Sequence, residues 1–520
     1  MVGGVLLVVL AVAAVGAIIL KSSKATLTAD ATAIAKIGLP AGGATIQSVS
    51  VVTGPHAAPV PVTVRGGRIY PVKLVPADER LSIQVVVKRP GWVSWLTGSL
   101  QRLQLAVTAP AASLRSHFVT VSNGPLRLHF KAPVSAYAYG TSPAHLRRQV
   151  MSSPSSVVTL PRGAAAGTVF VSATIRSWES GRAAAVSWFP SGGAATAVAN
   201  PAPGTTIQSG TPITLTFNNP VAKALGSHLP PVSPTTQGTW HTLNSHTIVF
   251  RPQGYGYGLG AKVEIPLPSG VHLVGGQSGS ANGGTWTVPG GSTLRLQQML
   301  AVLGYLPLTF HYAGSGVGLT PQDELKAAVS PPKGTFSWRY GDTPAALKSF
   351  WAPGTSGVMT KGALMAFEDS HGMAADGVAG PLVWKTLIAD MLAGHRSGFG
   401  YTFVSVSVAG QRLNLWHNGH TVISSTPVNT GIASAPTATG TYPVFEHIPV
   451  TTMSGTNPDG SHYSDPGIQW VSYFNGGDAL HAFTRAQYGF PQSLGCVEMP
   501  VGVAGQVYPY TPIGTLVHVA

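Results

Sequence analysis

The chain is poor in cysteine and in charged residues. Only one of its 520 residues is a cysteine, Cys496, which excludes an intrachain disulfide and a multi-cysteine zinc site. Charged residues make up 9% of the chain, against about 25% in an ordinary soluble domain. The 63 glycines and 42 prolines follow no three-residue period, which excludes collagen. Because 44% of the residues are hydrophobic, we expect a β-rich, loop-rich protein of several domains, not a disordered chain.

Acidic residues are scarce in the first part of the chain. Residues 1–200 hold 18 Lys and Arg against four Asp and Glu, whereas residues 201–520 hold 13 of each. A basic excess suits nucleic acid, anionic lipid or an anionic polymer. The sequence has no run of five basic residues, no zinc-finger spacing and no RNA-binding signature, so we expect no nucleic-acid partner. A membrane or cell-wall surface is the favoured partner, and a merely solubilising basic face explains the excess about as well.

Residues 2–20, VGGVLLVVLAVAAVGAIIL, contain no charged side chain. Nineteen such residues can span a bilayer core of about 30 Å, and they exceed the core of a signal peptide, which has about 7 to 15 residues. The pattern predicts an uncleaved transmembrane anchor over residues 1–24, with the remaining chain outside the cytoplasm. Lys21, Lys24 and Lys36 follow the span, which by the positive-inside rule argues for the opposite orientation. The modules predicted downstream nevertheless favour export of the remaining chain from the cytoplasm.

Short β-type runs separated by turn residues follow the predicted anchor. Runs such as SIQVVVK (82–88) and TVFVSATI (168–175) predict one or two small all-β modules over residues 25–200. Over residues 201–290, the runs GTPITLTFNNPVAKA and TIVFRPQGYGYGLGAKVEI alternate apolar and polar residues, which predicts an immunoglobulin-like sandwich. This stretch resembles the bacterial Ig-like modules that precede L,D-transpeptidase catalytic domains. The resemblance implies a spacer.

Helical periodicity replaces the strand pattern over residues 291–395. The predicted first helix has Thr293 as its N-cap, stops at Gly304, and places on one face Leu294, Gln297, Leu300 and Leu303. Two further helices are predicted, one over residues 361–370 with Thr360 as N-cap and one beginning at Pro381.

The segments LQQMLAVLGYLP and GVMTKGALMAFEDSHGMAADGVAGPLVWKTL resemble a three-helix peptidoglycan-binding domain. The resemblance implies that this region binds glycan or stem peptide as a module separate from the chemistry. Residues 308–350 form an insertion relative to the family, and its helical candidate, residues 322–329, could cover or reshape the glycan-facing groove. Asp376 could contact ligand, although an Asp-Gly pair is more often only a turn.

Residues 400–520 are strand-rich and contain a lone Cys/His pair. His481 lies fifteen positions before Cys496. A thiol with an ordinary pKa of about 8.5 needs a base to react at neutral pH, and a histidine within hydrogen-bond reach supplies one. Gly495 allows the backbone to approach closely, so that successive amides could stabilise an oxyanion. From these residues alone, a buried structural thiol remains open beside the nucleophile.

The order TMSGTNPDGSHYSDPGIQW, LHAF, GFPQSLGCVEMP and GTLVHV resembles the L,D-transpeptidase catalytic domain along essentially its whole length. The resemblance implies that Cys496 is the nucleophile, His481 its base, and the backbone carbonyl of Ala482 the group that orients the imidazole. It implies an oxyanion site formed by Ser493, the backbone of Leu494, Gly495 and the amide of Cys496. A substrate flap would carry Met453, Tyr463, Trp470 and Phe474. No metal or organic cofactor is implied, and the partners would be peptidoglycan stem peptides and glycan.

Two positions depart from the family pattern. Leu494 replaces its second histidine, and Glu498 stands where the family has Asn or Arg. Two alternatives therefore stay open: an L,D-carboxypeptidase of the same fold, and a non-catalytic cell-wall scaffold. A reactive thiol with a lowered pKa would favour an enzyme, and an inert thiol the scaffold.

Three other histidines are weaker candidates. His417 and His420 flank the predicted hairpin turn Asn418–Gly419 and could share a metal, but no third ligand is evident. His371 is expected at a helix C-terminus, where its charge would favour the helix dipole.

Overall fold

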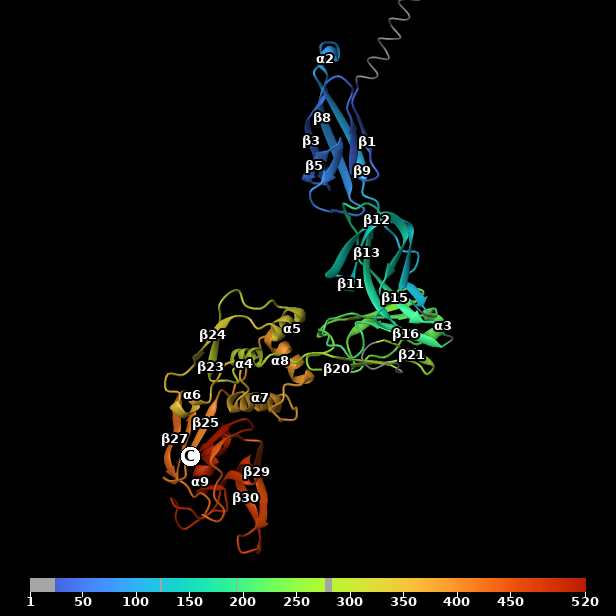
Figure 1. The fold of residues 1–520 in the computed structure, drawn as a ribbon. Coiled ribbons are helices and arrows are strands. Elements are labelled where there is room, and N and C mark those ends of the chain that lie inside the picture. Colours follow the sequence, from blue (N-terminus) through green and yellow to red (C-terminus); the bar gives the residue numbers. More distant parts are fainter. Residues whose placement is uncertain (1–23, 122–123, 193, 276–282) are drawn as a thin grey trace, which may run out of the picture.

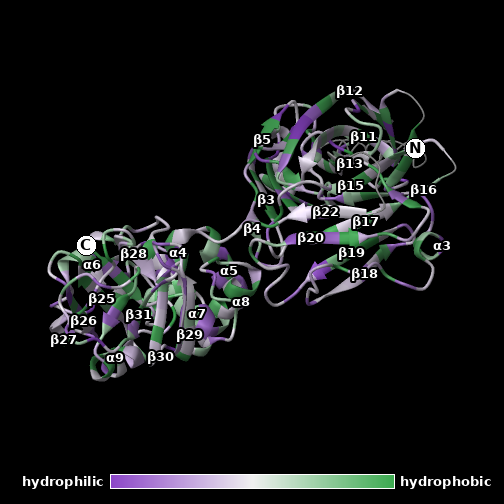
Figure 2. Ribbon diagram, turned by 90° about the horizontal axis from the view of Figure 1, so that it is seen from below, coloured by the Kyte–Doolittle hydropathy of each residue, from purple (hydrophilic) through white to green (hydrophobic). Residues whose placement is uncertain are grey.

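The protein is described here by a computed structural model that covers residues 24–121, 124–192, 194–275 and 283–520. The predicted anchor, residues 1–24, lies outside these residues except for Lys24. Among the residues that the structure describes, no helix is long and apolar enough to cross a membrane. Three β-rich units lead into a helical region and then the C-terminal sheets (Figure 1). Seen from below, the β-rich units lie on one side and the helices with the C-terminal sheets on the other (Figure 2).

The first unit packs two four-stranded sheets around one hydrophobic core. Strand β8 shows why it folds this way: Leu81, Ile83, Val85 and Val87 are fully buried, and most residues between them are exposed. One sheet has the order β1 (Thr26–Ala29), β2 (Ala35–Gly38), β6 (Arg68–Pro71), β5 (Val62–Arg65). The other has the order β4 (Ala58–Pro59), β3 (Thr45–Thr53), β8 (Arg80–Lys88), β9 (Leu100–Thr108), with helix α2 (Gly91–Thr97) joining β8 to β9.

The second unit is a five-stranded sheet with its own core. Its order is β10 (Phe118–Val121), β15 (Ala184–Pro190), β13 (Gly167–Thr174), β11 (Leu126–Ser142), β12 (His145–Leu160). Strand β14 (Glu179–Ser180) pairs in parallel with β7 (Val75–Pro76) of the first unit, and Trp178 is buried in the first unit's core. Residues 25–190 thus form two β units that contact each other.

The third unit is a two-sheet β structure around a core that contains Trp286. Its larger sheet has the order β18 (Gly238–Asn244), β19 (Thr247–Pro252), β17 (Ile213–Phe217), β16 (Ala195–Asn200), β21 (Val271–Leu273). The smaller sheet pairs β20 (Lys262–Pro266) with β22 (Gly283–Thr287), and helix α3 spans Val221–Leu225. The predicted boundary at residue 201 is corrected, because β16 precedes it and pairs with both β17 and β21.

The helical region has more elements than the three predicted helices. They are α4 (Thr293–Val302), β23 (Leu308–Tyr312), α5 (Pro321–Val329), β24 (Gly334–Trp338), α6 (Ala345–Ser349), α7 (Val358–Ser370) and α8 (Pro381–Ala393). Both predicted N-caps are wrong. Ser292, not Thr293, caps α4 by accepting a hydrogen bond from the Arg295 amide at 3.1 Å. Helix α7 begins after Gly357, so Thr360 is a buried helical residue whose hydroxyl lies 2.9 Å from Gln297 Nε2.

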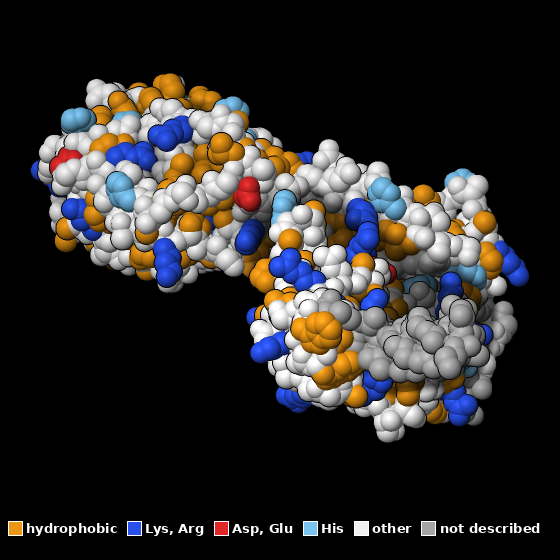
Figure 3. All heavy atoms as spheres, turned by 90° about the horizontal axis from the view of Figure 1, so that it is seen from above, with side chains coloured by type: hydrophobic (Ala, Val, Ile, Leu, Met, Phe, Trp, Pro, Cys, Tyr) orange, Lys and Arg blue, Asp and Glu red, His pale blue; other side chains and the backbone are white. Residues whose placement is uncertain are grey.

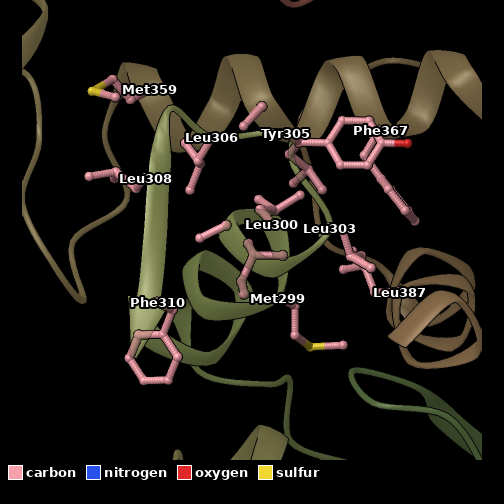
Figure 4. Close-up of a cluster of buried hydrophobic side chains, with 14 of the residues drawn as sticks. Met299, Leu300, Leu303, Tyr305, Leu306, Leu308, Phe310, Met359, Phe367 and Leu387 are labelled. Carbon is pink, nitrogen blue, oxygen red and sulfur yellow. The ribbon is translucent and has the colours of Figure 1, made fainter. Parts of the chain in front are cut away.

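Helix α4 is buried on nearly all sides, beyond the single predicted face. Elements α5, α7, α8 and β23 pack around it, and they bury Arg295 and Gln298 as fully as Met299 and Leu300. Figure 4 shows the apolar part of this core, with side chains from the α4 region, β23, α7 and α8 pointing toward one another.

The helical region and the C-terminal domain share this hydrophobic cluster. Tyr401, Phe403 and Leu516, from the C-terminal domain, are buried in it. Residues at the end of the insertion add polar contacts: Tyr340 Oη donates to Asn418 Oδ1 at 2.9 Å, and Trp416 Nε1 donates to Asp342 Oδ2 at 3.3 Å. The expectation of separate binding and chemical modules is therefore wrong, because each would expose apolar surface if separated from the other.

The C-terminal domain packs two sheets around a core that α9 (Val501–Val507) closes. One sheet has the order β27 (His420–Pro427), β26 (Arg412–His417), β25 (Thr402–Ser407), β33 (Leu516–Val519), β28 (Gly440–Pro443). The other has the order β29 (Glu446–Thr456), β30 (His462–Asn475), β31 (Asp478–Ala482), β32 (Val497–Met499). A 3₁₀ turn, η1, spans Tyr508–Tyr510. Asn418 and Gly419, at φ 47° and 89°, form the predicted hairpin turn.

The buried ion pair between Arg295 and Glu324 ties α4 to the insertion, and it yields a stability prediction. The Nη2–Oε2 distance is 2.6 Å and both side chains are almost fully buried. We expect Glu324→Ala to lower the free energy of unfolding by about 3 to 5 kcal/mol, because it leaves a buried guanidinium without its counter-charge. Denaturant unfolding followed by helical circular dichroism measures this.

The matched control is the double variant Arg295→Met with Glu324→Leu. It removes both charges and keeps apolar volume, so its stability should lie close to that of the wild type or above it. An equal loss in both variants would show that packing, not the unpaired charge, is responsible.

Candidate active site

Two adjacent strands place the Cys/His pair. Strands β31 and β32 are parallel, with His481 opposite Glu498. Paired residues project from the same face of a sheet, and so do residues two positions apart on one strand. Cys496 immediately precedes β32 and packs in one apolar cluster with Ala479, which lies on the same face of β31 as His481, although fifteen residues separate Cys496 from His481 along the chain.

His481 is held in a buried and oriented state. Its side chain is 3% exposed, and Nδ1 lies 2.9 Å from the carbonyl oxygen of Ala482. A carbonyl only accepts hydrogen bonds, so Nδ1 carries the proton and Nε2 is the basic nitrogen. Burial lowers the pKa of His481; the Ala482 carbonyl and the charge of Glu498 partly oppose this effect. The imidazole is therefore neutral at neutral pH and able to accept a proton.

Cys496 is half-buried. It packs against a small apolar cluster of Ile468, Val471 and Ala479, and Sγ lies 3.5 Å from the carbonyl oxygen of Gly477. Burial raises the pKa of Cys496 to about 12, with the carboxylate of Asp478 adding to the increase. A preformed thiolate is thus not a property of this site, and reaction at neutral pH requires transfer of the thiol proton during attack.

The loop before Cys496 is closed by its own hydrogen bonds. Ser493 is 2% exposed, and its hydroxyl donates to the Cys496 carbonyl at 2.5 Å. Gly495 has φ +115°, and a Cβ at this position would lie 2.4 Å from Asp478 Oδ1, so only glycine fits. The Ser493 hydroxyl fixes the loop, and Leu494 is half-buried.

Sequence reasoning did not find the partner of Glu498. Glu498 is 4% exposed and forms a two-pronged ion pair with Arg485, with Nε–Oε2 at 2.9 Å and Nη2–Oε1 at 2.6 Å. The guanidinium lies 4.4 Å from the centre of the Phe483 ring. The departure at Glu498 was itself the available signal, because a buried carboxylate needs a cation or several donors.

The four residues predicted for a substrate flap all lie on the hairpin of β29 and β30, but two of them face away from Cys496. Met453 packs in the cluster that holds Cys496, and burial raises the pKa of Tyr463, to which a thiolate on Cys496 would add. Phe474, however, is 3% exposed and lies in the main core on the opposite face. Trp470 packs toward that core and Tyr508, at 5.3 Å between ring centres. Alternation along β30 explains both, and it turns Tyr473, which was not predicted, toward Cys496.

A cleft of about 350 Å³ runs beside the histidine strand. Its lining includes Asp465 on β30 and Ala482, Phe483 and Thr484, which follow His481. The carboxylate of Asp465 acts on both His481 and Arg485, raising the pKa of each by a small amount beside larger effects. Asp465 therefore brings a negative charge to the edge of the site.

The remaining candidates have structural partners. His417 uses both ring nitrogens, Nδ1 with Thr402 Oγ1 at 2.8 Å and Nε2 with Asn418 Nδ2 at 2.9 Å. His371 ends α7, with Nε2 2.9 Å from Asp390 Oδ2. Within the described ranges, no group of three or more His, Cys, Asp or Glu could hold a metal ion.

Comparison with known proteins adds to this geometry. Residues 401–519 match the family model YkuD, the L,D-transpeptidase catalytic domain. The C-terminal domain is an L,D-transpeptidase catalytic domain. The match covers both His481 and Cys496 and supports a transpeptidase role for the protein. No curated protein matches the chain.

Solved structures with the same type of domain are also similar. One is an L,D-transpeptidase from Mycobacterium smegmatis, at 12% identity over 62% of this chain and 96% of that one, with a TM-score of 0.21. A second is LdtMt1 in complex with imipenem, at 10% identity over 62% and 97%, with a TM-score of 0.21. A third is the catalytic domain of the E. faecium L,D-transpeptidase, at 24% identity over 24% and 100%, with a TM-score of 0.22.

The charges around His481 predict a shift in the pH profile. The rate at which an acylating agent modifies Cys496 should fall as the pH drops through the pKa of His481, which burial lowers from its ordinary value of 6.5. This fall is the acid limb of the pH profile, and it should lie below pH 6.5. Glu498→Gln removes a charge that raises this pKa and leaves Arg485, which lowers it, unpaired. We therefore expect the limb to move to still lower pH, measured as acylation rate against pH.

The control is Glu498→Gln combined with Arg485→Met, which removes both opposing charges. Its limb should return toward that of the wild type. A limb that stays in place in the single variant would contradict the assignment of His481 as the titrating base.

Proposed function

We propose that the protein is a peptidoglycan L,D-transpeptidase that works through a thioester on Cys496. The observation that carries this proposal is that Cys496, just before β32, packs against Ala479 on the face of β31 that carries His481, inside a domain of the matching family. The acyl donor is a tetrapeptide stem, and the bond cleaved lies between its third residue and the terminal D-Ala.

Acylation begins with a neutral thiol and a neutral imidazole. As Sγ attacks the carbonyl carbon, its proton passes to Nε2 of His481, and the Ala482 carbonyl stabilises the imidazolium through Nδ1. The tetrahedral oxyanion is stabilised by backbone amides of the loop at residues 494–496, which Gly495 and the Ser493 hydrogen bond hold in place. Collapse expels D-Ala as an amine that takes the proton back from His481, and the thioester remains.

The acceptor would approach through the cleft that Asp465 lines. A side-chain amine of a second stem is cationic in water, and the Asp465 carboxylate attracts it toward the histidine. There it must lose a proton before it attacks the thioester, and His481, neutral again, is the base at hand. Attack releases the thiol and forms the cross-link.

Two alternatives differ from this proposal by one step each. If water resolves the thioester, the protein is an L,D-carboxypeptidase; the acidic cleft favours the amine. If Cys496 never reacts, the protein is a wall-binding scaffold, and the thiol pKa, which is raised to about 12, is the observation in favour. The oriented neutral His481 beside it opposes that scaffold function, since a base so held has no evident structural use.

The remaining parts of the chain are proposed to position this chemistry. Residues 2–20 would anchor the protein in the cell membrane, with the catalytic domain outside the cytoplasm at the cell wall. The three β units, the last of them Ig-like, would act as spacers. The peptidoglycan-binding-like helical region would hold glycan or stem while remaining packed on the catalytic domain through their shared core.

A carbapenem tests the nucleophile. Its strained lactam resembles the acyl donor, so Sγ should attack the lactam carbonyl, open the ring at its C–N bond and form a stable thioester. Intact mass should increase by one drug molecule in the wild type and remain unchanged in Cys496→Ala. His481→Ala should slow adduct formation by about 100-fold or more. Adducts that persist without Cys496 would exclude the mechanism.

Asp465→Asn tests the acceptor cleft. We expect carbapenem acylation to change little, whereas formation of cross-linked muropeptides from soluble stems should drop by about tenfold, since the acceptor loses an electrostatic attraction of roughly 1.4 kcal/mol. Mass spectrometry of the products measures both outcomes. Glu446→Gln, on the same hairpin, is the control for loss of a negative charge. Equal effects of Asp465→Asn on acylation and on cross-linking would assign Asp465 to the first step instead.

A further inference from the structure

One end of the first β unit presents exposed indole rings. Helix α2 carries Trp92, which is 47% exposed, and Trp95, which is 79% exposed. Leu39 and Leu100 beside them are 42% and 50% exposed. We call these four residues the tryptophan tip. Large apolar side chains that gather in this way mark an interaction site more often than isolated exposed residues do.

The fold holds these rings outward on a fixed base. Val93 is buried at 3% exposure and anchors α2, while Trp95 Nε1 donates to the Trp92 carbonyl at 3.0 Å. Trp92 covers Gly42, where an added Cβ would lie 2.6 Å from Nε1. The Arg89 guanidinium donates hydrogen bonds to the carbonyls of Thr97 and Gly98, and these bonds hold the end of α2 in place. The fold of the first unit therefore holds the tryptophan tip in a defined position.

The chain enters the first unit at this same end. Ala25 exchanges two hydrogen bonds of 2.9 Å with the side chain of Gln101, the second residue of β9 after the tip. Figure 1 shows α2 at the same end of the unit as the start of β1. Four residues, Lys21 to Lys24, separate the uncharged segment 2–20 from Ala25, and they can extend at most about 14 Å. A membrane that held this segment would lie within reach of the tip.

Basic side chains surround the tip. Lys24, Lys88 and Arg102 are exposed near it, and residues 1–200 carry 18 basic against four acidic residues. The view from above shows hydrophobic side chains at this end with Lys and Arg around them (Figure 3). Exposed apolar rings with basic side chains around them are complementary to a surface that has an apolar interior and a negatively charged outer layer.

We propose that the tryptophan tip docks into the interfacial region of an anionic phospholipid bilayer. Indole rings favour the depth at which an apolar body meets hydrated headgroups, and lysine and arginine bind the phosphates there. The contact rests on the proposed anchoring through residues 2–20 and adds a second, separate attachment. Two attachments fix the tilt of the first unit, which a single attachment does not.

A reporter beside the tip tests the contact in the full chain. In a Cys496→Ala background, Ser99→Cys gives one thiol for an environment-sensitive dye, and Val72→Cys, at a site 61% exposed and outside the tip, gives the matched control. The protein is reconstituted in vesicles of phosphatidylcholine and phosphatidylglycerol that contain nitroxide lipid. We expect quenching at position 99 and none at position 72. Trp92→Ser with Trp95→Ser should reduce the quenching at position 99 by about twofold or more.

The outcomes separate the tip from the anchor. Protein that fails to float with vesicles overturns the anchoring proposal. Protein that floats while the dye at position 99 stays unquenched, or is quenched equally after both Trp substitutions, overturns the tip proposal.

Weaker quenching in pure phosphatidylcholine or in high salt supports the anionic partner. Trp-dependent protection of the dye by isolated sacculi, without quenching by vesicles, would assign the tip to a wall polymer instead. Trp92→Phe with Trp95→Phe should retain most of the quenching.

Discussion

Because β31 and β32 run in parallel, His481 and Glu498 stand opposite each other, and Cys496, just before β32, packs against Ala479 on the face of β31 that carries His481. The rest of the site adapts to this pairing. The loop before Cys496 must turn within a few residues to enter β32, which requires Gly495 at positive φ and the Ser493 hydrogen bond. The Ala482 carbonyl follows His481 directly and orients it. The same register brings a carboxylate, Glu498, next to the base.

That carboxylate explains the charge arrangement of the site. A lone buried Glu498 would cost several kcal/mol, and Arg485 balances it with two hydrogen bonds. The pair acts on His481 with opposite signs, so burial remains the largest influence and keeps the imidazole neutral. A neutral base beside an un-ionised thiol means that charge develops only as substrate reacts. The raised thiol pKa counts toward the scaffold alternative, and an enzymatic reaction at this site would depend on proton transfer during attack.

The shared core gives the catalytic domain a rigid neighbour. Tyr401, Phe403 and Leu516 pack with α4 and α7 in one cluster, and the insertion adds Tyr340 and Asp342 to the contact. Buried apolar contact of this kind resists domain motion far better than a polar linker does. Any ligand held by the helices would thus keep a fixed position relative to Cys496, whereas the β units are arranged on the other side of the molecule (Figure 2).

The sequence by itself determined the features that are encoded locally. Short β-type runs marked β8 and β13, the Asn418–Gly419 pair marked its hairpin, and the motif around Cys496 marked the catalytic domain. Tertiary structure decided what depends on partners distant in sequence. Thr360 resembled a helix cap, but its hydroxyl accepts a hydrogen bond from Gln297. Phe474 resembled a flap residue but faces the core. Glu498 had no partner recognisable in the sequence, and folding brings Arg485 to it. Local patterns record a residue's own preferences, whereas its burial and charge depend on which segments pack against it.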